Sequence, residues 1–123
     1  MTVPAGVDSL EAAQDLFPGY VVTRRVGAGG MGEVFFGHPE DFPNDFRALK
    51  TPHLALVQGS PQIAVRFRRE AFAIQRVRSP HVVRVLDIGE TRDGRPFLAM
   101  EWLDGRTLSE ALDDPTSPFG NPF

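Results

Sequence analysis

The chain has 123 residues, a formal net charge of −3 at pH 7 and no cysteine. This length suits one small domain with a modest core. The slight acidity gives no general attraction to nucleic acid or to anionic membranes, and the lack of cysteine excludes disulfides and thiolate metal sites.

The beginning of the chain does not resemble a targeting signal. It has no basic segment, and Asp8, Glu11 and Asp15 interrupt any apolar run. No apolar stretch approaches the length that crosses a membrane. We therefore expect a cytoplasmic protein without a signal peptide.

Residues 1–19 are expected to form an N-terminal extension. Asp8 or Ser9 is a suitable N-cap for a short helix, which Pro18 would end. We interpret this extension as a loosely held leader.

A glycine-rich segment from Val26 to Val34 reads Val-Gly-Ala-Gly-Gly-Met-Gly-Glu-Val and is the most informative motif of the chain. Glycine has no Cβ, so such a loop presents bare backbone N–H groups, which suit phosphate oxygens. The spacing Gly27-x-Gly29-x-x-Gly32 occurs both in dinucleotide-binding folds and in kinases, so the residues that follow must decide between them.

The residues after Gly32 favour a strand. A dinucleotide fold needs a helix directly after the third glycine, whereas Phe35 and Phe36 are typical of strands and Pro39 ends any helix early. A P-loop is excluded as well, because Glu33 stands where a lysine is required. We predict that the glycine-rich loop joins two strands, 20–26 and 33–37.

A third strand is predicted over 46–51, in which Phe46, Ala48 and Lys50 share one face. Lys50 is the only lysine of the chain, and every other basic residue that carries a fixed charge is arginine. Lysine supplies a compact point charge where phosphate approaches closely. A small residue and a lysine beneath a glycine loop thus leave room for a flat ring and supply a cation for phosphate.

A helix is predicted from Pro61 to about Arg78, with Ser60 as its N-cap. At 100° per residue, Glu70 lies within about 60° of four apolar side chains: Ile63, Phe67, Ile74 and Val77. A buried carboxylate is costly unless it is paired. We expect Glu70 to pair with Lys50; the alternative is that Glu70 lies at the edge of the stripe and reaches solvent.

Two further strands, 82–90 and 95–103, are predicted to form a hairpin around Asp93-Gly94. Residues 104–123 should contain a short helix, introduced by a capping box, and then an irregular proline-rich tail. The predicted fold is α+β: a five-stranded antiparallel sheet with one major helix.

In combination these motifs resemble the N-terminal lobe of a bacterial eukaryote-like serine/threonine protein kinase, from Tyr20 to about Leu112. The resemblance implies that residues 20–103 form an ATP-binding lobe. It implies that Lys50 holds the α- and β-phosphates and that Glu70 orients this lysine.

The resemblance also implies contacts with the rest of ATP. It assigns the phosphates to the glycine-rich loop, which consists of Gly27, Ala28, Gly29, Gly30, Met31 and Gly32. It assigns the roof over the adenine to three small apolar residues, Val26, Val34 and Ala48. Met100 takes the gatekeeper position, and the backbones of Glu101 and Leu103 would bond the adenine edge.

The catalytic motifs of the family are missing. Family members use His-Arg-Asp-x-x-x-x-Asn and Asp-Phe-Gly in the larger lobe to receive the substrate proton and to hold magnesium. The nearest match is Asp41-Phe42-Pro43, which precedes Lys50 and cannot serve. Members of the family use ATP and magnesium to phosphorylate protein substrates. For this chain alone we expect no metal ligands and no catalysis. The histidines lack metal-ligand spacing and are expected at the surface: His38, His53 and His81.

Two interpretations remain open, and a dinucleotide oxidoreductase is nearly excluded. The chain is either a truncated kinase, or a stand-alone module that binds nucleotide or a partner. A truncated kinase should keep an apolar surface toward the large lobe, and Ile74 and Val85 at the family's spine positions are apolar. We therefore favour a fragment whose underside contacts a large lobe or another protein.

Overall fold

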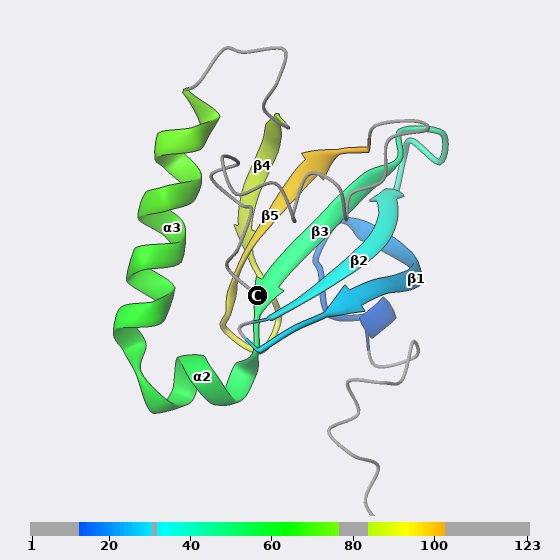
Figure 1. The fold of residues 1–123 in the computed structure, drawn as a ribbon. Coiled ribbons are helices and arrows are strands. Elements are labelled where there is room, and N and C mark those ends of the chain that lie inside the picture. The colour runs from blue at the N-terminus through cyan, green and yellow to red at the C-terminus, as the bar shows by residue number, and fades with distance from the viewer. Residues whose placement is uncertain (1–12, 31, 77–83, 103–123) are drawn as a thin grey trace, which may run out of the picture.

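The computed structural model describes residues 13–30, 32–76 and 84–102, which form one sheet flanked by helices (Figure 1). In chain order the elements are β1 (Tyr20–Ala28), β2 (Gly32–Pro39), β3 (Arg47–Pro52), α2 (Leu54–Gly59), α3 (Pro61–Gln75), β4 (Val85–Glu90) and β5 (Pro96–Glu101). The strand order is β1-β2-β3-β5-β4, and every neighbouring pair is antiparallel. The predicted five-stranded antiparallel sheet with one major helix is confirmed.

Alternation along the strands gives the sheet two buried faces. One face packs against α3 through a cluster that includes Val34, Ala48, Ala71, Ile74, Val85, Leu98 and Met100. The opposite face buries Ala13, Phe17, Tyr20, Val22, Phe35, Leu49, Phe97 and Ala99. Lys50 follows Ala48 by two residues and so belongs to the face that packs against α3, hereafter the α3 face.

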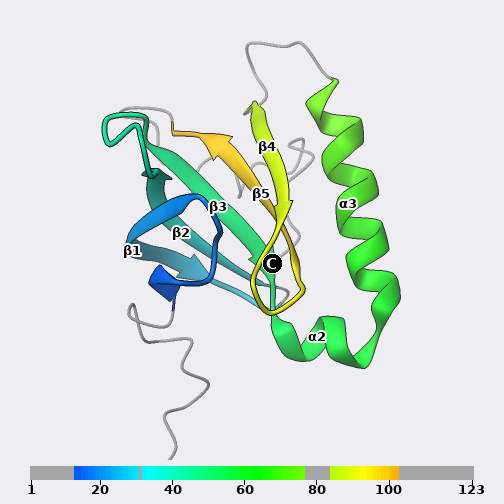
Figure 2. The ribbon, with the colours of Figure 1, turned by 180° about the vertical axis from the view of Figure 1, so that it is seen from behind.

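Residues 13–19 cover the second face and are not the loosely held leader that we expected. The Phe17 side chain is 1% exposed, and its ring meets Phe35 and Phe97 edge-on at centroid distances of 5.5 and 5.1 Å. The Arg92 amide donates to the Leu16 carbonyl at 2.9 Å, and the segment lies across the sheet in Figure 2. A sheet with two apolar faces needs a cover on both. The cap predicted at residues 8–9 lies outside the described residues.

The predicted helix is confirmed as α3, with Ser60 at the N-cap and Pro61 at the first position. Helix α2 was not predicted, and the physical reason is that its six residues are fewer than two helical turns, too few for a helical period to show in the sequence. The helix and tail expected within 104–123 lie outside the described residues. In the described part of the chain, no helix is both long and apolar enough to cross a membrane.

Candidate functional site

The glycine-rich segment forms the turn between β1 and β2. Gly27 pairs with Val34 across the two strands, and the Gly29 amide donates to the Gly32 carbonyl at 2.9 Å. A Cβ added at Gly27 or Gly30 would meet no atom within 4 Å. The fold itself therefore leaves space for side chains at these two positions, and glycine there suits the close approach of another group. The strand predicted after Gly32 is confirmed as β2.

The structure brings several predicted site residues together on the α3 face. Val34 pairs with Lys50 across β2 and β3, and Ala48 pairs with Met100 across β3 and β5. All four side chains are buried, and Val26 packs against the same cluster while remaining partly exposed. The predicted roof and gatekeeper positions thus belong to one cluster on the α3 face, of which Val26 is the partly exposed member. Of the remaining predicted residues, Met31 and Leu103 lie outside the described residues.

Lys50 is a titratable group on this face. Its side chain is 1% exposed. Burial lowers the pKa of Lys50 to about 7, and the charge of Glu70 opposes this change in part. A lysine with a pKa near neutrality changes its charge readily in response to a nearby anion. The site therefore contains a buried amine whose charge depends on the groups that surround it.

Glu70 is exposed, so the expectation that it lies in the middle of the apolar stripe is wrong. The residues of α3 that face the sheet are Ala64, Phe67, Ala71 and Ile74. By helical geometry their mean direction is about 80° from Glu70, which places Glu70 at the edge of the stripe. The charge of Glu70 partly opposes the lowering of the Lys50 pKa, while the pairing of the two side chains stays a prediction. The orienting role of Glu70 stays a prediction.

Ile74 and Val85 do not distinguish a truncated protein from a complete module, contrary to our expectation. Their side chains are 7% and 6% exposed, and both belong to the cluster between α3 and the sheet. Their apolar character is required by the core of this domain alone. It carries no information about a further domain.

His53 has a role that the sequence did not reveal, because we expected it at the surface. Its Nε2 lies 2.6 Å from the Gly29 carbonyl oxygen, and its side chain is only 29% exposed. The signal that could have identified it is register: Pro52 pairs with Gly32 across β2 and β3, which returns His53 to the glycine-rich loop. His38 is half-buried, and His81 lies outside the described residues.

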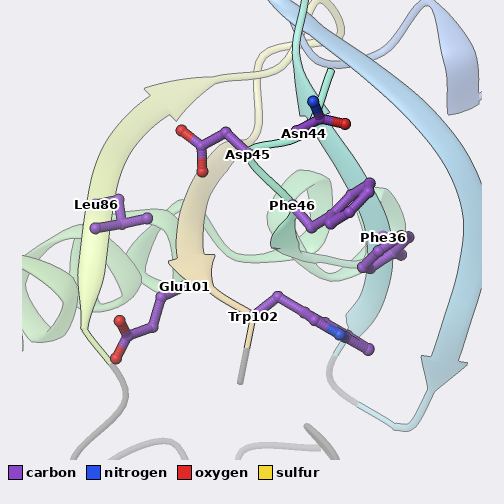
Figure 3. Close-up of a pocket in the computed structure, with 7 residues that line it drawn as sticks. All are labelled: Phe36, Asn44, Asp45, Phe46, Leu86, Glu101 and Trp102. Carbon is purple, nitrogen blue, oxygen red and sulfur yellow. The ribbon is translucent and has the colours of Figure 1, made fainter. Parts of the chain in front are cut away.

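A hollow of about 720 Å³ opens beyond the Ala48–Met100 surface (Figure 3), lined by Phe36, Asn44, Asp45, Phe46, Leu86, Glu101 and Trp102. Its aromatic wall is ordered: the rings of Phe36 and Trp102 meet edge-on at 4.5 Å, and Phe46 stacks on Phe36 at 5.2 Å. Glu101, predicted to contact a ligand through its backbone, lines this hollow, and its Oε1 accepts a hydrogen bond from the Arg84 amide at 3.3 Å. The hollow extends the candidate site toward the end of β5.

Similarities to known proteins agree with this geometry, although no protein-family model matches the chain. Over 99 residues it is 37% identical to serine/threonine-protein kinase pkn2 of Myxococcus xanthus, covering 80% of this chain and 12% of that protein. Over 98 residues it is 37% identical to serine/threonine-protein kinase PknF of Mycobacterium tuberculosis, covering 80% of this chain and 20% of that protein.

The fold is similar to the crystal structure of the PknI kinase domain of Mycobacterium tuberculosis. The TM-score is 0.60 and the sequence identity 30%, with 94% of this chain and 41% of that chain covered. The chain thus spans well under half of each of these three proteins.

Proposed function

Because this chain is a homologue of bacterial serine/threonine protein kinases and has the fold of their N-terminal lobe, we propose that it binds ATP. The observation that carries the proposal is the buried Lys50, which lies beside Val34 on the α3 face, next to a glycine turn with open space around it. A buried lysine and bare backbone N–H groups provide two kinds of phosphate donor at one end of the sheet.

The other contacts follow from the same surface. The adenine ring would lie against Val34, Ala48 and Met100, and its edge would meet the backbone of Glu101 and of Leu103. The phosphates would extend toward the amides between Gly27 and Gly32 and toward Lys50, which Glu70 would orient. The phosphate charge would raise the pKa of Lys50, so the lysine would bind the nucleotide in its protonated form.

Phosphoryl transfer needs groups that we do not assign to this chain. The family holds magnesium and accepts the substrate proton with motifs that the sequence lacks. Among the described residues, no group of three His, Asp or Glu side chains is arranged to hold a metal ion. We therefore propose that the chain alone binds nucleotide and transfers no phosphate. Transfer of phosphate to protein serine or threonine would require a large lobe. As the location of the chain we propose the cytoplasm.

An alternative function is that of a stand-alone module that binds a partner protein. The hollow in Figure 3 favours it, because Phe46 is 45% exposed and stands beside the half-buried rings of Phe36 and Trp102. Aromatic side chains of this kind are enriched in protein interfaces.

The test is a titration of the isotope-labelled chain with ATP and with adenosine, followed by amide NMR. We expect shifts at Gly27, Gly30, Ala48 and Met100, with dissociation constants no tighter than the high micromolar range. The reason is that one face of the ligand stays in water, whereas good pockets bury about 70–90% of a ligand. The Lys50→Met variant should lose the preference for ATP over adenosine. Binding of ATP and adenosine with equal affinity would contradict the proposal.

Catalysis needs a separate assay, in which γ-labelled ATP, magnesium and a generic protein acceptor are incubated with the chain. We expect background incorporation, equal to that of Lys50→Met. Incorporation that disappears in the variant would show that the chain, alone or as an oligomer, assembles an active site.

A further inference from the structure

A buried carboxylate lies on the other side of the glycine-rich loop from the nucleotide surface. Glu33 is 1% exposed and alternates with Val34, so it points to the face opposite Lys50. Three basic side chains surround it. Its Oε2 lies 3.3 Å from Nη1 of Arg95 and 4.0 Å from Nδ1 of His53, and its Oε1 lies 3.7 Å from Nη2 of Arg25.

Arg95 connects Glu33 to two other segments. The Arg95 guanidinium, itself 4% exposed, donates through Nη1 to the Pro52 carbonyl at 2.9 Å, and through Nε and Nη2 to both carboxylate oxygens of Asp93, each at 2.9 Å. Burial alone would raise the pKa of Asp93, but hydrogen bonds from Arg95 and Thr91 outweigh it and lower that pKa. One side chain thus joins the start of β2, the end of β3 and the β4–β5 turn.

His53 completes the attachment at the other end of the loop. Its Nε2 lies 2.6 Å from the Gly29 carbonyl, while its Nδ1 faces Glu33. Gly29 at one end of the turn is therefore attached to His53, and Glu33 at the other end is attached through Arg95 to the Pro52 carbonyl at the end of β3. Between them, a Cβ placed at Gly30 would meet no atom within 4 Å, so the middle of the turn gains no packing at that position.

We propose that Glu33 is a positioning residue, which, through its bond from Arg95 and together with the contact of His53 on Gly29, fixes the glycine-rich loop over the nucleotide surface without touching the nucleotide. The inference rests on the proposed function. Glycine loses more backbone freedom on ordering than any other residue, and a loop ordered before binding does not spend that entropy on the ligand. A carboxylate at this position is costly to bury, and the Arg95 guanidinium offsets that cost while connecting the start of β2 to the end of β3.

The experiment uses Glu33→Gln, which keeps the shape of the side chain and removes its charge. Amide hydrogen exchange in the nucleotide-free chain should become about tenfold faster or more at Gly29, Gly30 and Gly32, as expected for the loss of the charged hydrogen bond between Arg95 and Glu33. Amides at the β3–β5 pairing should change less. The affinity for ATP should fall by a similar factor, while that for adenosine should change little, because only the phosphates need the loop.

Two further variants keep the test decisive. Phe17→Leu lowers stability on the same face of the sheet without touching the loop, and it should accelerate exchange evenly. Arg95→Lys keeps the positive charge but loses the planar fork of the guanidinium. It should accelerate exchange at the same loop amides as Glu33→Gln, and it replaces Glu33→Gln in the test if the Glu33 variant does not fold.

The outcomes separate the two hypotheses. If the Glu33 and Phe17 variants accelerate exchange in the same even pattern, or if the loop amides do not respond, Glu33 is only a core residue and the inference is overturned. If the wild-type chain binds no ATP, the proposed function fails, and the exchange pattern alone decides whether Glu33 fixes the loop.

Discussion

Replacing Lys50 by methionine should make the domain more stable at neutral pH and should remove a specific pH dependence. Burial lowers the pKa of Lys50 from 10.5 to about 7, and in the unfolded chain the ordinary value returns. Between pH 7 and 10.5 the unfolded state therefore binds more protons than the folded state. The free energy of unfolding must then rise with pH across this window.

The size of the effect follows from the same change. A pKa lowered from 10.5 to about 7 corresponds to about 5 kcal/mol across the full window. Methionine fills a similar volume and carries no charge. We expect the variant to be more stable than the wild type by about 2–5 kcal/mol at pH 7, with a nearly flat stability between pH 7 and 10.

The measurement is urea unfolding at several pH values between 6 and 10, followed by circular dichroism so that the whole sheet reports. Arg24→Met serves as the matched control, because Arg24 is exposed and its charge does not change in this range. The control should keep the rise of stability with pH. A flat wild-type profile, or a rise that persists in the Lys50 variant, would refute the assignment of the titrating group to Lys50.

Three further predictions follow from other sites. Burial raises the pKa of Tyr20 to about 12, so stability should fall between pH 10 and 12 in the wild type and stay level in Tyr20→Phe, as read by the same unfolding experiment. ATP binding near pH 8 should take up close to one proton, since phosphates restore the charge of Lys50; calorimetry in buffers of different ionisation enthalpy measures it, and absence of uptake contradicts phosphate contact. Gly30→Ala should change the free energy of unfolding by no more than about 0.5 kcal/mol and should weaken ATP binding. Gly37→Ala should unfold the domain, because a Cβ there overlaps the Val21 carbonyl. An equal loss of stability in the two variants would be evidence against open space at the loop.

The strands and α3 were predictable because local patterns are sufficient to define them. The alternation around Ala48 and Lys50 indicates a strand. The proline after Ser60 indicates the start of a helix. Neither pattern depends on the elements that pack beside it. Most boundaries shifted by a few residues at most, and the order of the elements was correct. The interpretation of residues 13–19 failed, because their burial depends on a second apolar face of the sheet, which becomes visible only when the strands are assembled.

Glu70 illustrates a different limit. A helical projection gives angles between side chains but not the direction of the sheet, which is set by tertiary packing. We centred the buried stripe on Glu70 by including Ile63, which is only partly buried, and Val77, which lies outside the described residues. The small residues Ala64 and Ala71 face the sheet instead, since they allow α3 to approach it closely. Alanine contributes little to apolar periodicity. We therefore predicted the buried stripe from the larger apolar residues and not from the alanines.

Glu33 and Val34 show why the two sides of the glycine-rich loop differ in how well they could be predicted. Val34 faces a surface whose partners, Ala48 and Lys50, lie in a motif with a recognisable order along the chain. Glu33 faces Arg95, 62 residues away, and His53, which follows a strand end. An ion pair between such distant positions has no local pattern, and it exists only because β2 and β3 pair in one register and the β4–β5 turn lies beside the strand ends. Alternation on a single strand therefore places the proposed ligand surface on one face of β2 and the attachments of the loop on the other, so a one-residue slip of β2 would exchange them and abolish both.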